Sequence, residues 1–564
     1  MSDARKVLNA LGGVDEKFIE EAAEPGPLRR KKPNWKVWGG CVAAAIAVAI
    51  GIGALSGGAD KDVKTDLADT RQSIMVTTNT TSVTEAASAP AEAPALAEST
   101  APMSREEEMA ELIAANDAII AELNDGLVLN SLDNAEYLEK CASSGLVAGA
   151  PEYPERAVNP EAAYDMNSPI ADWDSYSAAN DKYYAETREI TDEVKGYEIP
   201  LRAFTETSAK EFLIGNEDNT VYSPLNVYMA LSMLAELTDG DSRQQILDVL
   251  CLPDIDSVRD EARKLWLANY SNDGMTTLLL GTGSWISEEL DVNQEVLETL
   301  VEKYYAFYVV GEMGSSEMDQ SFRDWLSAQT MGLLDDFVSG EHFDPDTVLA
   351  LASTIYYKAH WQDVFNDDNT EDAVFHAKDG DQTVPFMNEK RSGSISWGSN
   401  FTAAFKPMAG RQRMYFVLPD EGSTVDEVLA NDQFWTMLSG SDDYENVKHG
   451  CIVTMSIPKF DVSSGANLID GLRALGVEDV FSPDASDFSA LTPQKGVFVG
   501  KVSHNARVKI DEEGVEAAAY TAMLLCGSSM PTDYVDFICD RPFIFAIQNY
   551  DGAVLFMGTV NSIK

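Results

Sequence analysis

The stretch SPLNVYMALSML (Ser223–Leu234) decides how the rest of the chain is interpreted, because it predicts a long buried helix. The Ser-Pro pair opens this helix, since proline is well tolerated at a first helical position. Immediately before it, TVY predicts a short strand, and an apolar helical pattern precedes that strand. The order helix, short strand, buried helix indicates the core of a large globular domain.

Strand patterns dominate the chain downstream of this helix. They are VLALASTIYYKAHW, RMYFVLP, CIVTMSIPKFDV, GVFVGKVSHNARVKI, FIFAIQN and AVLFMGTV. Helices that come first and strands that follow predict an α+β fold with large sheets. This texture begins after Tyr197, so we expect the globular domain to span residues 198–564.

Composition argues against a nucleic-acid partner, a zinc site and a disulfide framework. The chain has 564 residues, with 93 acidic against 41 basic side chains and a formal net charge of -52, whereas a nucleic-acid-binding protein needs a basic surface. Six widely spaced cysteines include no C-x-x-C pair, so we expect free thiols and neither a zinc site nor a disulfide framework. They stand at positions 41, 141, 251, 451, 526 and 539.

The N-terminal part predicts a membrane anchor. Residues 1–36 end in a basic cluster, and the uncharged run VWGGCVAAAIAVAIGIGAL (37–55) is just long enough to cross a hydrocarbon core of about 30 Å as a helix. The positive-inside rule leaves residues 1–36 in the cytoplasm and everything after Leu55 outside. The alternatives are a signal peptide cleaved near Ser56–Ala59, which would give a secreted protein, and a buried core helix. We expect an uncleaved single-pass anchor.

Two segments separate this run from the globular domain. Residues 56–103 are rich in Ala, Thr, Ser, Pro and Glu and predict a low-complexity linker. Residues 104–197 begin with a predicted helix from about Arg105 to Leu123 and continue as an acidic stretch rich in Tyr, Asp and Pro. We interpret 104–197 as a stalk or accessory region.

Seven collinear segments between Leu201 and Lys564 resemble the serpin family of serine protease inhibitors. The family pattern SPxSxxxALxML appears as SPLNVYMALSML, and IYFKGxWxxxFxxxxTxxxxF appears as IYYKAHWQDVFNDDNTEDAVF (355–375). The other matches are FRDWLSAQTMGLLDDFV, MSIPKFDV, GVEDVFSPDASDFSALT, RPFIFAI and VLFMGTV. The resemblance implies the serpin fold, with helices, three β-sheets, a large central sheet A and an exposed reactive-centre loop.

The resemblance also implies an activity, suicide-substrate inhibition of an extracellular serine protease by a monomer. The protease attacks the loop and forms an acyl-enzyme, and the cut loop inserts as a new central strand of sheet A. The protease is thereby displaced and deformed before it can deacylate. Such insertion is β-strand addition within one chain, and it releases stored strain.

The stretch DEEGVEAAAYTAMLLCGSS (511–529) matches the hinge and loop of the family. Because side chains alternate along a strand, every second loop residue must be free of charge to enter the sheet core. The inward set is Val515, Ala517, Ala519 and Thr521. The outward set, Glu516, Ala518, Tyr520 and Ala522, holds the only charge and the only aromatic ring. The resemblance assigns the hinge to Glu512, Gly514, Val515, Glu516, Ala517, Ala518, Ala519 and Thr521.

Spacing within the family predicts the reactive bond. Pro542 follows Gly514 by 28 residues, as in members whose bond lies fourteen residues after that glycine, which indicates Ser528–Ser529. Leu525–Cys526, Cys526–Gly527 and Met530 remain alternatives. No Arg or Lys occurs between Gly514 and Met530, which disfavours trypsin-like enzymes because their pocket would bury an unpaired charge. Small residues suit elastase-like or subtilisin-like serine proteases, and a papain-like cysteine protease is an alternative partner.

The resemblance predicts a buried polar cluster where sheet A must part. The corresponding residues are Ser223, Asn226, Ser353 and His504. The family has serine where Asn226 stands and asparagine where Ser353 stands. Buried polar groups need partners, and this exchange keeps one amide and one hydroxyl in the cluster. We therefore interpret it as a compensated exchange.

The sequence contains no catalytic or metal-binding motif. Its five histidines form no H-E-x-x-H, and there is no P-loop, dinucleotide fingerprint or nucleophile elbow. The acidic runs NDDN and KDGD lack the ligand pattern of a calcium loop. We expect an inhibitor without catalytic residues, metal or cofactor. The rival function is that of a non-inhibitory serpin-fold protein with a binding or structural role at the surface.

Overall fold

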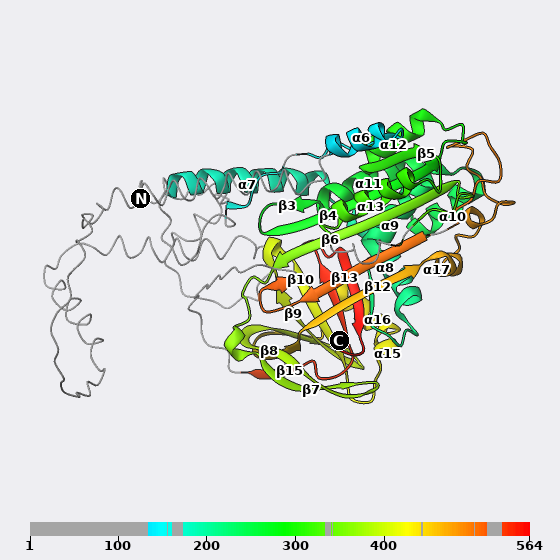
Figure 1. Ribbon diagram of the computed structural model, residues 1–564. Coiled ribbons are helices and arrows are strands. Elements are labelled where there is room, and N and C mark those ends of the chain that lie inside the picture. Colours follow the sequence, from blue (N-terminus) through cyan, green and yellow to red (C-terminus); the bar gives the residue numbers. More distant parts are fainter. Residues whose placement is uncertain are drawn as a thin grey trace, which may run out of the picture. The chain divides into compact units, whose positions relative to one another are not determined.

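The computed structural model describes residues 134–154, 156–160, 173–332, 340, 342–440, 444–500, 502–515 and 533–563 (Figure 1). All of them belong to the unit Ala101–Lys564. The predicted cytoplasmic segment, membrane helix, linker and Arg105–Leu123 helix lie outside these residues. Within the described ranges, no helix has the length and hydropathy needed to cross a bilayer.

The buried helix predicted from SPLNVYMALSML is α9 (Pro224–Leu237), which lies at the centre of the helical layer. The Ser223 side chain caps it by accepting a hydrogen bond from the Asn226 backbone N–H, and every side chain of α9 except Ala230 is buried. Around α9 lie α8 (Glu198–Leu213), α10 (Gly240–Leu250), α11 (Ile255–Asn269) and α12 (Gln294–Tyr304). The remaining described helices are α6 (Asn134–Ser143), α7 (Trp173–Glu193), α13 (Ser316–Gln329), α15 (Val425–Leu429), α16 (Asp432–Leu438) and α17 (Ile469–Ala474).

Sheet A has the strand order β1-β5-β4-β6-β14-β13-β12, and a short strand, β3, pairs with β4. β4 and β6 form its longest ladder, antiparallel from Thr276↔Ala359 to Ile286↔Leu349. The bounds are β1 (Val147–Gly149), β3 (Ser271–Asn272), β4 (Thr276–Ser287), β5 (Ala306–Gly311), β6 (Leu349–His360), β12 (Phe460–Asn467), β13 (Val502–Ile510) and β14 (Gly514–Val515).

The second sheet has the order β15-β11-β8-β9-β10-β16-β17-β2, with β7 paired to β8. The family is expected to have three sheets, but here two of them are joined because the 18-residue strand β8 pairs with both β11 and β9. The bounds are β2 (Thr220–Tyr222), β7 (Glu371–Ala377), β8 (Gly380–Trp397), β9 (Phe401–Pro407), β10 (Arg413–Pro419), β11 (Val447–Pro458), β15 (Tyr534–Ile538), β16 (Phe543–Gln548) and β17 (Val554–Val560).

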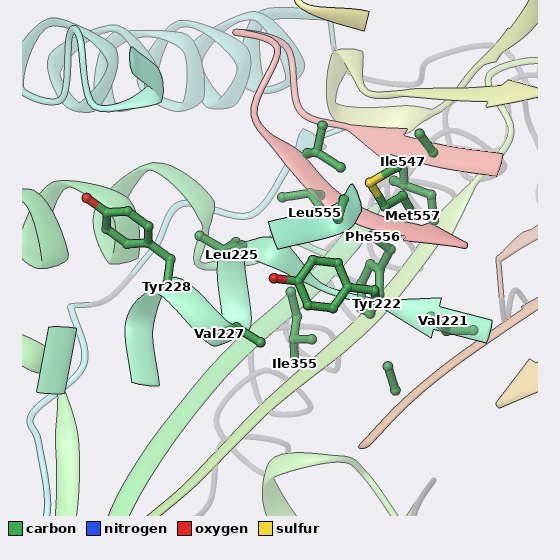
Figure 2. Close-up of a cluster of buried hydrophobic side chains, with 14 of the residues drawn as sticks. Val221, Tyr222, Leu225, Val227, Tyr228, Ile355, Ile547, Leu555, Phe556 and Met557 are labelled. Carbon is green, nitrogen blue, oxygen red and sulfur yellow. The ribbon is translucent and has the colours of Figure 1, made fainter. Parts of the chain in front are cut away.

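One large hydrophobic core joins the helices to both sheets. Figure 2 shows Tyr222 of β2, Leu225 of α9, Ile355 of β6 and Phe556 of β17 gathered in one part of it. Its members come from helices early in the chain and strands later in it. The predicted α+β fold is therefore confirmed.

Part of the region 104–197 packs on the domain that is predicted to span residues 198–564. β1 pairs with β5 antiparallel, from Val147↔Val310 to Gly149↔Tyr308, and so forms an edge of sheet A. Tyr137 and Cys141 of α6 are buried in a second hydrophobic cluster with tryptophan and phenylalanine side chains of the domain. A three-residue strand has too little periodicity to be detected in a sequence.

Candidate functional site

Two of the hinge residues, Gly514 and Val515, already lie within sheet A, as strand β14. Gly514 pairs with His360 and Val515 with Ala359 of β6, both antiparallel, and Val515 also pairs with Ile510 of β13. No residue with a side chain fits at position 514 without a shift of the backbone, because a Cβ added to Gly514 would lie 2.2 Å from the Ala359 carbonyl oxygen. The Val515 side chain is buried in the main core.

Most of the predicted loop lies outside the described residues. This applies to the rest of the hinge and to the predicted reactive bond. The residues concerned are Glu516, Ala517, Ala518, Ala519, Thr521, Ser528 and Ser529.

A seam separates β6 from β13 over most of their length. The two strands pair in parallel only at Val502↔Leu351 and Ser503↔Ala352, and β14 lies between them at the other end. A strand along the whole seam would have to break these pairs and move β6 and β13 apart by one strand spacing, about 4.8 Å.

Glu512 anchors the base of the hinge. Its Oε1 accepts a hydrogen bond from Thr370 Oγ1 at 2.7 Å, and its Oε2 lies 2.5 Å from Lys459 Nζ. Its backbone carbonyl accepts a hydrogen bond from the Phe365 N–H at 2.8 Å. Burial alone would raise the pKa of Glu512, but the hydrogen bonds from Lys459 and Thr370 outweigh it and hold the pKa below the ordinary value.

Trp361 fixes the backbone on both sides of Glu512. Its indole Nε1 donates to the Asp511 carbonyl at 2.9 Å, and its backbone N–H donates to the Glu513 carbonyl at 2.9 Å. Lys406 lies under the Trp361 ring and pairs with Glu389 at 2.7 Å, and burial lowers the Lys406 pKa to about 8. Trp361, Phe365, Thr370 and Lys459 thus hold the base of the hinge through hydrogen bonds.

The sequence pattern does not reveal Trp361, Thr370 and Lys459 as partners of the hinge. All three lie inside stretches that indicate the fold, IYYKAHWQDVFNDDNTEDAVF and MSIPKFDV. A lysine in an otherwise apolar strand segment was the available signal, because a buried charge needs a partner.

The predicted polar cluster is assembled and buried. Ser223 Oγ donates to the Leu555 carbonyl at 2.7 Å, and the Ser223 N–H donates to His504 Nε2 at 3.2 Å. Asn226 Nδ2 lies 3.4 Å from His504 Nδ1. All four residues, Ser223, Asn226, Ser353 and His504, are less than a tenth exposed.

Asn226 and Ser353, the two exchanged residues, contact each other directly. Asn226 Nδ2 donates to the Ser353 carbonyl at 3.1 Å, and Ser353 Oγ donates to the Asn226 carbonyl at 3.1 Å. The Ser353 hydroxyl also bonds the Asn226 amide oxygen. α9 and β6 are thus linked through the two positions at which this chain has asparagine and serine exchanged relative to the family pattern.

The cluster lies immediately beyond the paired end of the seam. Ser353 follows Ala352 on β6 and His504 follows Ser503 on β13, so a strand entering the seam would pass between Ser353 and His504. Burial lowers the pKa of His504 to about 4, which keeps its imidazole neutral at neutral pH.

An antiparallel hinge strand, a nearly unpaired seam and a buried polar cluster beside it thus lie together in the central sheet. The family model described as Serpin (serine protease inhibitor) matches residues 200–563. The chain belongs to the serpin family, whose members are mainly protease inhibitors and not catalysts.

Relatives of this chain occur in plants, archaea and animals. Serpin-ZX of Arabidopsis thaliana is 28% identical over 364 residues, 62% of this chain and 93% of its own length. A serpin-like protein of Methanosarcina acetivorans is 27% identical, and the match covers 66% of this chain and 88% of that protein. Neuroserpin of Mus musculus is 28% identical, covering 65% and 92%.

Solved structures share the fold. Native tengpin, a thermophilic serpin, superposes with a TM-score of 0.59 at 24% identity, over 65% of this chain and 95% of tengpin. AtSerpin1 of Arabidopsis, in its native stressed conformation, gives a TM-score of 0.57 at 25% identity, over 66% of this chain and 98% of AtSerpin1. Human thyroxine-binding globulin gives 0.56 at 22% identity, over 66% and 100%.

The exchanged pair predicts a coupled response to mutation. Asn226→Ser and Ser353→Asn should each lower the free energy of unfolding by about 1–3 kcal/mol, because each leaves a buried polar group without its partner. The double variant should recover at least about 1 kcal/mol of the summed loss, measured by denaturant unfolding. Strictly additive losses would show that the two positions are not coupled.

His504 predicts a pH dependence of stability. The unfolded chain has a histidine pKa near 6.5 and the native state a lower one, so this contribution is complete above pH 6.5 and is lost as pH falls toward 4. Between pH 7.5 and pH 5 the wild type should lose about 2 kcal/mol of unfolding free energy more than His504→Gln does. His342→Gln, at an exposed position, is the control and should lose as much unfolding free energy as the wild type over this pH range.

Proposed function

We propose that this serpin inhibits extracellular serine proteases by inserting its cleaved reactive loop into sheet A between β6 and β13. The observation that carries the proposal is β14, because Gly514 and Val515 already occupy the start of that strand, antiparallel to both neighbours. An inserted loop would lengthen β14 toward Leu349 and would keep the antiparallel orientation that β14 already has.

The register of β14 supports the alternation of the loop side chains. Continued along β6, it would bring Ala517 opposite Tyr357 and Ala519 opposite Ile355, whose large side chains are buried. Continued along β13, it would bring the same alanines opposite Val508 and Ala506. Larger inward residues would overpack this core, so the alanines suit insertion better than helix formation.

The same register would bring Thr521 between Ser353 and His504. Thr521 has the only hydroxyl of the inward set, and Ser353 and His504 belong to the buried polar cluster. We propose that the Thr521 hydroxyl joins this cluster when the loop is inserted.

The identity of the protease is proposed from the loop sequence. We propose cleavage at Ser528–Ser529 by an elastase-like or subtilisin-like serine protease, with a papain-like cysteine protease as the alternative. The absence of Arg and Lys around this bond argues against trypsin-like targets.

The location of the protein is proposed from its N-terminal sequence. We propose that residues 37–55 anchor it in a membrane, with 1–36 in the cytoplasm and the serpin domain outside, as in a bacterial surface protein. The support is the basic cluster beside an uncharged nineteen-residue run.

A serpin fold alone does not establish inhibition, and thyroxine-binding globulin is among the similar solved structures. The alternative function is therefore a non-inhibitory serpin with a binding or structural role. The uncharged inward set and the paired hinge favour inhibition over this alternative.

Incubation with an elastase tests the proposed function directly. The wild type should form a covalent complex that survives a denaturing gel, and mass spectrometry should place the cut at Ser528–Ser529. Ala517→Arg should be cleaved without forming a complex, because insertion would bury an unpaired charge. Ala518→Arg, one residue along in the outward set, should still form the complex. Cleavage of the wild type without a complex or a gain in thermal stability would favour the binding role.

Thr521 predicts a difference that is confined to the cleaved form. Thr521→Val should lower the unfolding free energy of the cleaved protein by about 1 kcal/mol, the net value of one hydrogen bond, and leave the intact protein unchanged. Thr521→Ser should restore the stability, and Tyr520→Phe, in the outward set, should have no effect. An equal loss in the intact and cleaved proteins would refute a role in the inserted state.

A further inference from the structure

β1 and β5 fit each other closely through two glycines. A Cβ added to Gly149 of β1 would lie 2.2 Å from Cε1 of Tyr308, so this glycine leaves room for the Tyr308 ring. On the other strand, a Cβ added to Gly311 would lie 2.4 Å from Cδ2 of Leu146, and Leu146 itself is buried. The segment before the family domain therefore forms a matched edge of sheet A.

α6 fastens this edge to α13. The Tyr137 hydroxyl donates to the Ser321 carbonyl of α13 at 3.1 Å, and its ring meets Phe307 edge-on at 5.8 Å. α13 in turn packs on β4, β5 and β6. α6, β1 and α13 are thus attached to the half of sheet A that lies on the β6 side of the seam.

Tyr153, Arg156 and Asn159 contact the same half of sheet A and the helix beside it. Tyr153 stacks on Trp266 of α11 at 5.1 Å, and Arg156 Nη2 donates to the Leu267 carbonyl at 2.9 Å. The Asn159 N–H donates to the Asp273 carbonyl, in the turn between β3 and β4, at 2.8 Å.

α7 connects this half of sheet A to the second sheet. Near its middle, the Tyr183 hydroxyl donates to Asp273 Oδ2 at 2.6 Å, and Glu186 Oε1 accepts from the Ala157 N–H at 3.0 Å. Near its C-terminal end, Thr191 Oγ1 accepts from the Tyr550 hydroxyl at 3.4 Å. Tyr550 lies in the turn between β16 and β17.

The link continues at the last residue of α7 and directly after it. The Tyr197 hydroxyl bonds Asp551, which is also in the β16–β17 turn, and Glu193 pairs with Arg263 of α11 at 2.7 Å. α7 packs on α11, and α6 packs on β1 and α13. Figure 1 shows part of the long helix α7 next to β3. The described residues between 134 and 193 therefore contact both parts of the domain.

We propose that these residues form a brace that resists opening of sheet A and so slows entry of a strand between β6 and β13. The brace comprises 134–154, 156–160 and 173–193. The proposal rests on the proposed function in one respect, that a strand enters this seam.

The physical reason is that α7 is bonded on both sides of the required movement, while α6 and β1 hold together the half of sheet A that must move. Opening the seam shifts β6, β4, β5 and β1 relative to β13 and the second sheet. Because α7 holds Asp273 on the moving half and Tyr550 on the second sheet, opening must stretch or break one of these bonds. Loss of a brace contact should therefore accelerate opening.

Entry of a synthetic peptide into the intact full chain tests the brace without any protease. The probe is VEAAAYTAMLL, the sequence of residues 515–525, whose binding is followed on native gels over time. Tyr183→Phe should raise the rate of peptide entry about fivefold, because one hydrogen bond to Asp273 is lost. Tyr184→Phe is the matched control on the same helix, since Tyr184 is half exposed, and it should leave the rate unchanged.

A second variant addresses the β1 edge. Gly149→Ala should detach β1 by collision with Tyr308 and raise the entry rate about tenfold, whereas Gly340→Ala, at a position with open space, should not. Both variants should keep the wild-type circular dichroism spectrum. Unchanged entry rates in Tyr183→Phe and Gly149→Ala would overturn the brace.

The outcomes for the brace and for inhibition are separable. If the peptide enters no variant and no protease complex forms, insertion as a mechanism fails, and hydrogen exchange of amides 349–353 then decides the brace. Faster exchange in Tyr183→Phe than in Tyr184→Phe supports it, and equal exchange overturns it. If complexes form but the brace variants behave as wild type, inhibition stands and the brace is wrong.

Discussion

Two backbone pairs, Val502 with Leu351 and Ser503 with Ala352, join β6 directly to β13 in the described part of sheet A. Edge groups that lack a ladder partner form a template for an added strand. At the other end β14 already holds the strands apart at the spacing of a sheet. The site is therefore a gap between two strands and not a set of reactive groups. The hinge lies at one end of the gap and the polar cluster at the other.

The groups around this gap are buried and bonded in ways that favour one arrangement of the chain. At the hinge end, Glu512 is held by Lys459 and Thr370, and at the other end a neutral His504 accepts from the Ser223 N–H. Buried polar groups of this kind are costly when a partner is lost, so each end resists partial rearrangement. A sheet built in this way should open as a unit rather than fray.

The sequence predicted the fold and the polar cluster because both depend on long, collinear patterns such as SPLNVYMALSML and IYYKAHWQDVF. It did not predict that Gly514 and Val515 are paired in sheet A, since a two-residue strand has no period. The Glu512–Lys459 contact joins residues far apart in the chain, and no local rule connects them. β1 and α7 were missed for a related reason, because their contacts are single aromatic rings and hydrogen bonds, not an apolar stripe.

The placement of tryptophans gives the molecule built-in optical probes. Trp361 is fully buried and bonds the Asp511 carbonyl at the hinge, while Trp266 of α11 is fully buried and stacks on Tyr153, which follows β1 in the chain. An indole changes its emission when its hydrogen bond or its stacking partner changes. Movement of the hinge and release of the sheet edge would therefore alter the fluorescence of two different residues. Replacing one of these two tryptophans with phenylalanine removes its part of the summed emission of the nine tryptophans, so the two events can be followed separately without attached dyes.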